Sequence, residues 1–310
     1  ANFNQSIGNW DTSRVTNMSN MFRNAIRFNQ SIGNWDTSRV TNMSNMFRAA
    51  RSFDQNISNW DTSRASNMSY MFYEAVRFNN GGSHEIDNWN TSNVTNMSNM
   101  FFGAANFNQT IGGWNTSRVT NMSNMFTSAE AFNQDISGWD VSNVRDMNSM
   151  FFGAANFNQP LNSWDVSNVT NMSQMFRNSF DGTFNQPLDS WDVSNVTDMS
   201  YMFFGDTNFN QPLNSWDVSN VTNMNQMFRN VNAFNQPLDS WDVSNVTNMT
   251  EMFYYAATLN QDLSEWNVVN VTNWNNFGWG RASQLQTHQL SSVDFLLLTS
   301  LLHHLRCGRL

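Results

Sequence analysis

The residue that follows each of eleven repeated tryptophans is the best candidate for chemistry in this sequence, and it is Asp at eight positions and Asn at three. Because carboxylates stacked at strand spacing repel one another, a bound cation or a sugar-type ligand would account for this column. Alternatively, each side chain accepts hydrogen bonds from the Thr/Val-Ser-Arg/Asn segment after it, as an Asx turn. The candidate binding residues are Asp11, Asp36, Asp61, Asn90, Asn115, Asp140, Asp165, Asp192, Asp217 and Asp242, and Asn267 ends the column.

Groups that could support catalysis or bind a metal are few. The histidines are His84, His288, His303 and His304, and the last two form only a loose metal-binding pattern with Cys307. His84-Glu85 is an acid–base pair outside the repeat pattern, with no third group to orient it. Catalysis needs one asymmetric set of groups, whereas this chain repeats one pattern. We therefore predict that the protein is not an enzyme and that it has no catalytic residue, metal site or cofactor.

The elements that position the Asp/Asn column come from an internal repeat. Most intervals between the eleven tryptophans are 25 residues, and the exceptions are 29 and 27. Residues 79–85 lengthen one unit and residues 180–183 lengthen another. Insertions in a repeat array normally map to loops on one face.

Each unit combines two hydrophobic periods, for example in residues 157–176. Trp164 and Val166 flank Asp165 with a period of two, which predicts a short strand with Asp outward. Val169, Met172, Met175 and Phe176 follow at spacings of three and four, which suits a helical or 3₁₀ turn. One unit cannot bury its own apolar face, so successive units must stack. We predict a solenoid of about eleven 25-residue coils, with a parallel β-sheet on one wall and short helical or 3₁₀ turns on the other.

The pattern Leu-x-x-Trp-x-Val-Ser-x-Val-x-x-Met-x-x-Met-Phe resembles the BspA-family leucine-rich-repeat surface proteins. More narrowly, it is similar to their Mycoplasma-lipoprotein-type "WDvSnVtnMsxMF" repeats. The resemblance extends over residues 1–277. It implies an extracellular or surface-displayed, leucine-rich-repeat-like solenoid that is often linked to adhesion. It implies no enzyme activity, no ligand and no transferable catalytic residue.

The two ends of the chain differ from the repeat in different ways. We expect residues 1–277 to form the solenoid, without an N-terminal cap, because Ala1 already lies within a repeat. Either more repeats precede Ala1, or this end packs on another subunit. Residues 278–310 depart from the pattern, and Ser292 could cap a helix there. This segment is interpreted as a C-terminal cap or tail, with a partner-binding or anchoring helix and a gene-model artefact as alternatives.

Charge limits the possible partners. The formal charge of −9 and the pI near 4.7 argue against a nucleic acid or an anionic membrane surface as principal partner. No apolar run reaches the roughly 18 residues of a membrane helix, so we expect no transmembrane span. Residues 1–77 hold eight Arg and five acids, whereas residues 78–277 hold four Arg and eighteen acids. This asymmetry favours head-to-tail assembly or a polarised binding face, unless it reflects drift among duplicated repeats.

These observations predict a non-enzymatic protein of the cell surface or extracellular space. Its expected work is adhesion, through recognition of a protein or glycan ligand by the solenoid face, with the Asp/Asn column as the contact line. The alternative is a structural building block of an extracellular filament or sheath, in which copies of the chain join end to end.

Overall fold

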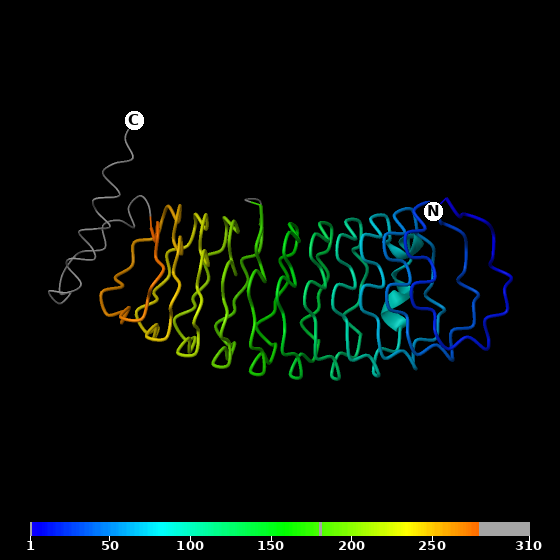
Figure 1. The fold of residues 1–310 in the computed structure, drawn as a ribbon, viewed down its shortest axis with the longest axis horizontal. Coiled ribbons are helices and arrows are strands. Elements are labelled where there is room, and N and C mark those ends of the chain that lie inside the picture. Colours follow the sequence, from blue (N-terminus) through cyan, green and yellow to red (C-terminus); the bar gives the residue numbers. More distant parts are fainter. Residues whose placement is uncertain (1, 180–181, 279–310) are drawn as a thin grey trace, which may run out of the picture.

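The protein forms one elongated stack of coils (Figure 1). The structure is a computed structural model, and it describes residues 2–179 and 182–278. Each repeat makes one coil, and we number the coils one to eleven by their tryptophans, from Trp10 to Trp266. The expected cap or tail at 278–310, with its helix from Ser292, lies outside the described residues except for Gly278. No helix within the described ranges is long and apolar enough to span a membrane.

A parallel backbone ladder joins the coils along one wall. Met43 and Asn45 donate their N–H groups to the carbonyls of Asn67 (3.0 Å) and Ser69 (2.9 Å) in the next coil. Met46 instead donates to Met43 in its own coil, at 3.2 Å. The chain therefore alternates between a bond to the next coil and a tight turn within its own. Isolated parallel bridges mark this wall at Asn17, Asn42, Asn67, Asn96, Asn121, Asp146, Asn171, Asp198, Asn223, Asn248 and Asn273.

The ladder lies in the segment for which we predicted a helical turn, so that part of the prediction is wrong. Asn20 and Asn45 have φ of 61° and 57°, and the equivalent residue of every later coil is also left-handed. A left-handed residue in each turn prevents a right-handed helix from continuing. Within the described ranges, the helices are two 3₁₀ segments in the longer insertion, η1 (Asn80–Gly82) and η2 (His84–Asn88).

The strand predicted around Trp164-Asp165-Val166 is also absent, although its side chains face as expected. Trp164 and Val166 are buried, and Asp165 is exposed. Trp164 donates its N–H to Leu161 at 3.0 Å, and Val169 donates to Val166 at 2.9 Å. Because these two tight turns flank the segment, it has no length over which to extend.

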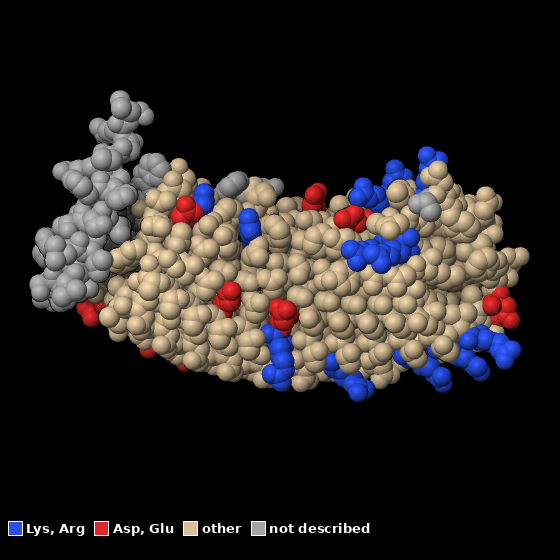
Figure 2. Space-filling view, in the orientation of Figure 1, with Lys and Arg blue, Asp and Glu red and all other residues tan. Residues whose placement is uncertain are grey.

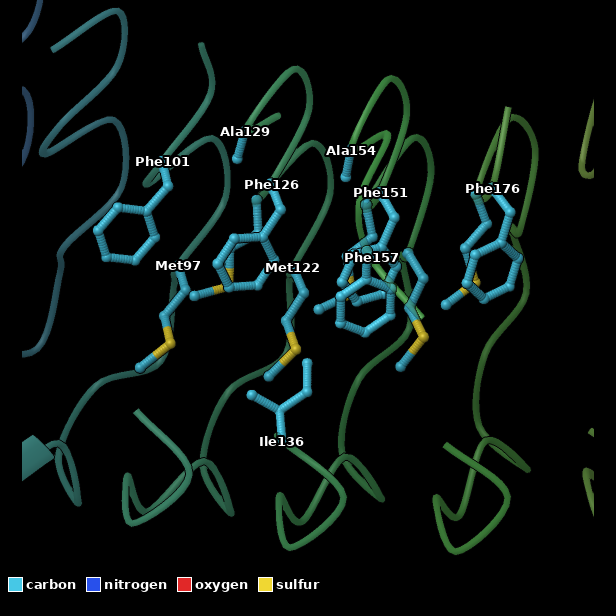
Figure 3. Close-up of a cluster of buried hydrophobic side chains, with 14 of the residues drawn as sticks. Met97, Phe101, Met122, Phe126, Ala129, Ile136, Phe151, Ala154, Phe157 and Phe176 are labelled. Carbon is cyan, nitrogen blue, oxygen red and sulfur yellow. The ribbon is translucent and has the colours of Figure 1, made fainter. Parts of the chain in front are cut away.

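The interior consists of stacked columns of identical side chains. Figure 3 shows Met97, Met122, Phe101 and Phe126 projecting into the same interior from successive coils. Phe101 and Phe126 stack with ring centroids 5.7 Å apart and planes 6° apart. All four side chains are fully buried. The counts of Met and Phe in the sequence therefore record one shared core that runs through the stack.

Tryptophan adds a polar link between neighbouring coils. Trp164 donates its indole N–H to the carbonyl of Ile136 in the preceding coil at 3.1 Å. The same carbonyl accepts the backbone N–H of Trp139 at 3.1 Å. Equivalent indole bonds join every coil from Trp35 to Trp266 to the coil before it.

A third set of bonds explains the many asparagines. Asn133 accepts the backbone N–H of Asn158 at 3.0 Å and the Nε2 group of Gln159 at 2.9 Å. An amide satisfies a backbone donor in the next coil without placing like charges one coil apart. This column therefore contributes to the low charge of the chain, and it contains Asn4, Asn29, Asp54, Asn79, Asn108, Asn133, Asn158, Asn185, Asn210 and Asn235.

Candidate functional site: the outward aspartate and asparagine column

The column after the tryptophans forms a line of Asx turns. The Oδ1 atom of Asp165 accepts the backbone N–H of Ser167 at 3.1 Å and its hydroxyl at 2.6 Å. Asn115 makes the same two contacts to Ser117, at 3.1 and 2.7 Å. The turn therefore accepts a carboxylate or an amide equally well. This geometry matches the Asx-turn alternative drawn from the sequence, and it leaves the binding role of the column as a proposal.

The carboxylates keep one oxygen available for a ligand. Each Asp of the column is exposed, and its bonds to the turn end on Oδ1. The column therefore presents one solvated acceptor per coil, repeated along the stack.

Hydrogen bonding lowers the pKa of several carboxyl groups of the column. The Ser13 hydroxyl, followed by the Ser13 backbone N–H, holds the pKa of Asp11 below its usual value. The same two causes lower the pKa of Asp140 and Asp242. Asp36 acts in the opposite direction on Asp11, because two carboxylates one coil apart repel each other. The serine hydrogen bonds therefore favour the charged form of these carboxyl groups, and repulsion between neighbouring carboxylates opposes it.

Compensation of this charge differs between the two halves of the stack. In coils one to three an arginine follows three residues after the Asp, and Arg39 and Arg64 lower the pKa of Asp36 and Asp61 after the serine contacts. In coils six to ten the equivalent residue is Asn, which donates to a serine carbonyl of the preceding coil at 2.8 Å. We call the Asp residues of these five coils the aspartate row: Asp140, Asp165, Asp192, Asp217 and Asp242.

The other candidate residues from the sequence are metal-binding and acid–base groups. Across the described ranges, no three His, Cys, Asp or Glu side chains lie close enough together to hold a metal ion. His84 and Glu85 lie in η2, where the Ser83 hydroxyl contacts Glu85 at 3.5 Å. His288, His303, His304 and Cys307 lie outside the described residues.

One buried carboxyl group, that of Asp206, is not among the candidate residues predicted from the sequence. Asp206 is fully buried, and neither of its carboxylate oxygens has a hydrogen-bond partner among the residues that the structure describes. It occupies a column that is alanine in most coils, for example Ala129 and Ala154. Desolvation raises the pKa of Asp206 well above its usual value. Aligning the repeats column by column would have revealed this acid among alanines.

Comparison with protein-family models identifies the family of this chain. A family model described as "Mycoplasma protein of unknown function, DUF285" matches three consecutive stretches, residues 1–84, 80–183 and 177–291. The chain belongs to the DUF285 family. This match agrees with the Mycoplasma-type part of the resemblance drawn from the repeat. A search of curated proteins finds no match to this DUF285 chain.

Two solved structures resemble this DUF285 protein weakly. An internalin (inlF) from Listeria monocytogenes str. 4b F2365 is 9% identical, with a TM-score of 0.29, and the match covers 87% of this chain and 75% of that one. A leucine rich cell surface protein from Faecalibacterium prausnitzii A2-165 is 13% identical, with a TM-score of 0.31, and the match covers 89% of this chain and 80% of that one. At these TM-scores neither likeness supports an argument about fold or function.

Proposed function

We propose that this DUF285 protein is a non-enzymatic recognition protein of the cell surface or extracellular space. Its contact line is the Asp/Asn column, and its ligands are proteins or glycans that present cationic groups. The aspartate row is the strongest part of this line, because no arginine follows its carboxylates in the turn.

One observation carries the proposal: the Asx turn does not require a charge. Asn90 and Asn115 make the same turn that Asp11 and Asp140 make. Asp nevertheless occupies eight of the eleven positions, although neighbouring carboxylates repel each other. A cationic ligand would offset this repulsion, and the rigid stack would hold the carboxylates ready to bind it.

An array of peptides and glycans tests the proposal, and arginine-rich peptides serve as the defined probe. The chain should bind these peptides in a salt-sensitive manner. The variant Asp192→Asn/Asp217→Asn keeps both turns and should bind roughly tenfold more weakly, since each exposed ion pair contributes up to about 1 kcal/mol. The matched control is Asp146→Asn/Asp198→Asn, which changes the same charge on the ladder wall and should bind like the parent. Equal binding by all three proteins would contradict the role of the row.

A second candidate is the building block of an extracellular filament or sheath. The separation of charge along the stack favours it, because residues 1–77 carry an excess of arginine and residues 78–277 an excess of acids. Negative-stain images of the purified protein test this candidate, because long rods would support it and single, monodisperse particles would contradict it.

A further inference from the structure

Arginines gather on the first three coils. Figure 2 shows blue side chains concentrated over the N-terminal end of the stack, and the chain contains no lysine. We call the arginines of the ladder wall and the adjoining edge the arginine patch: Arg23, Arg27, Arg48, Arg51 and Arg77. Backbone bonds between coils hold these positions together, from Asn24 to Arg48 and from Ser52 to Ile26.

Little within the described residues neutralises the patch. Arg51 forms an ion pair with Glu74 at 2.8 Å, and no other arginine of the patch lies within ion-pair distance of an acid. The Arg48 guanidinium lies over the rings of Tyr70 and Tyr73, 5.2 and 4.6 Å from their centroids. Arginine and tyrosine are also the residues that most often anchor protein interfaces.

The same chain carries the complementary surface. The aspartate row places one exposed carboxylate on each of five successive coils, with Asn instead of Arg three residues later. The arginine patch and the aspartate row both follow the repeat of the coils. The arginines of one copy and the aspartates of another therefore recur at matching intervals along their stacks. The two surfaces lie on different coils, which lets one molecule use both at once.

We propose that the arginine patch of one molecule docks on the aspartate row of a second copy. This inference rests on the proposed recognition role of the row, and it names this chain as one of the row's partners. Because the contact joins two different surfaces, it is heterologous, and repetition of the contact builds a staggered chain of molecules. The contact lies along the sides of the solenoid and so differs from end-to-end stacking of coils.

Sedimentation velocity over a concentration series tests the contact. At about 0.01 M salt, where the Debye length is about 30 Å, the mean mass should rise with concentration. At about 1 M salt, where the Debye length is about 3 Å, the protein should remain monomeric. A protein that is monomeric at both salt concentrations, or one that associates equally in both, would overturn the proposal.

Two sets of variants identify the surfaces. Arg27→Gln/Arg77→Gln removes exposed charges from the patch, and Asp192→Asn/Asp217→Asn/Asp242→Asn removes charges from the row while keeping its turns. Each should weaken association by roughly tenfold or more. The row variant also lowers the net negative charge of the protein, and that change alone would strengthen non-specific association. The row variant should nevertheless associate more weakly than the parent. The control Arg118→Gln/Arg145→Gln should associate like the parent, and association unchanged in the patch or row variant would refute the assignment.

A mixing experiment provides the sharpest test. The patch variant retains a row and the row variant retains a patch, so an equimolar mixture should form a complex of one copy of each. At protein concentrations at which each variant alone is monomeric, that complex should not grow further, because its two remaining surfaces are the weakened ones. A mixture that stays monomeric, or that grows beyond two copies, would contradict the inference.

The arginine-rich peptide probe separates this inference from the proposed function. The patch variant keeps its aspartate row and should still bind that probe while failing to self-associate. Binding of the probe without self-association would refute only the present inference. Self-association that needs both surfaces, without binding of the probe, would refute only the wider recognition role.

Discussion

A left-handed backbone conformation recurs at one position of every coil and at a second position of most coils. The first position follows the bridging residue by three and includes Asn20, Tyr70 and Glu251, with φ of 61°, 57° and 54°. The second is glycine in three coils, at Gly103, Gly153 and Gly205, but Ala49 with a φ of 55° in another. A residue with a Cβ atom pays roughly 1–2 kcal/mol for this conformation, whereas glycine does not.

Ala49→Gly should therefore stabilise the protein by about 0.5–1 kcal/mol, because relief of the left-handed strain exceeds the added entropy of the unfolded chain. Urea denaturation measures the change. The matched control is the neighbouring Ala50→Gly, where Ala50 is fully buried and has no positive φ. That change should destabilise the protein by about 1 kcal/mol. Equal losses at both positions would show that residue 49 carries no such strain.

Asp206 is a buried polar group without a hydrogen-bond partner among the described residues, so its replacement should stabilise the protein. Asp206→Ala restores the alanine of the other coils and should stabilise the protein at pH 7 by about 2 kcal/mol. Its native pKa is raised, so the native state holds the proton and Asp206 costs stability as the pH rises above about 3.9. The gain from Asp206→Ala should therefore be smaller below that pH, where only the cost of burying an unpaired neutral carboxyl group remains. Thermal melts of both proteins across pH measure it, and Asp217→Ala, which loses an Asx turn, should be destabilised instead.

At the scale of the element, each coil depends on its neighbours more than on any secondary structure of its own. The bonds that join coils come from alternate backbone N–H groups of the ladder, the asparagine amides and the tryptophan indoles. Such a stack behaves as a series of nearest-neighbour contacts. A tryptophan with a preceding coil is buried, as Trp164 is at 2% exposure, whereas Trp10 in the first coil is 52% exposed.

Trp164→Phe tests this dependence. It removes the indole bond to Ile136 and leaves a small cavity, which together should cost about 2–3 kcal/mol. The carbonyl of Ile136 keeps the backbone N–H of Trp139, so the loss stays below that of a fully orphaned acceptor. Trp10→Phe is the control and should change stability by less than about 0.5 kcal/mol. Guanidinium denaturation of both variants measures the difference, and similar losses at the two sites would refute it.

At the scale of the whole molecule, acidic pH should lower the stability of the stack through small contributions from several carboxyl groups. Serine hydrogen bonds lower the native pKa of Asp11, Asp36, Asp61, Asp135, Asp140, Asp242 and Asp262. A carboxyl group whose pKa is lower in the native state stabilises the fold above its unfolded pKa of about 3.9. That stabilisation is lost as the pH falls through the native pKa.

Urea midpoints should therefore fall as the pH decreases below about 4, where the unfolded chain binds more protons than the native protein. Replacing the column aspartates by asparagine keeps the turns and removes the titrating groups. A variant carrying this change at Asp11, Asp36, Asp61, Asp140 and Asp242 should lose less stability between about pH 5 and pH 3 than the parent. Identical pH profiles would show that these carboxyl groups do not titrate differently in the folded state.

The repeat length, the number of coils and the residues that face inward follow from the order of the amino acids alone. A copied pattern places Trp, Met and Phe at equivalent positions, and stacking is the way in which such short units bury them. The sequence also predicted the outward column and the Asx turn as one account of it. These conclusions hold because they depend on spacing along the chain, which the sequence contains directly.

The position of the backbone ladder and the grouping of the charges depend instead on contacts between coils. The spacing of Val169, Met172, Met175 and Phe176 fits a helical turn, and it fits equally well a chain that alternates tight turns with bonds to the next coil. The sign of φ at Gln174 separates the two, and the bonds to the next coil set it. The isolation of Asp206 and the grouping of the arginine patch likewise depend on contacts between coils. Such contacts join residues about one repeat apart, so no local pattern contains them.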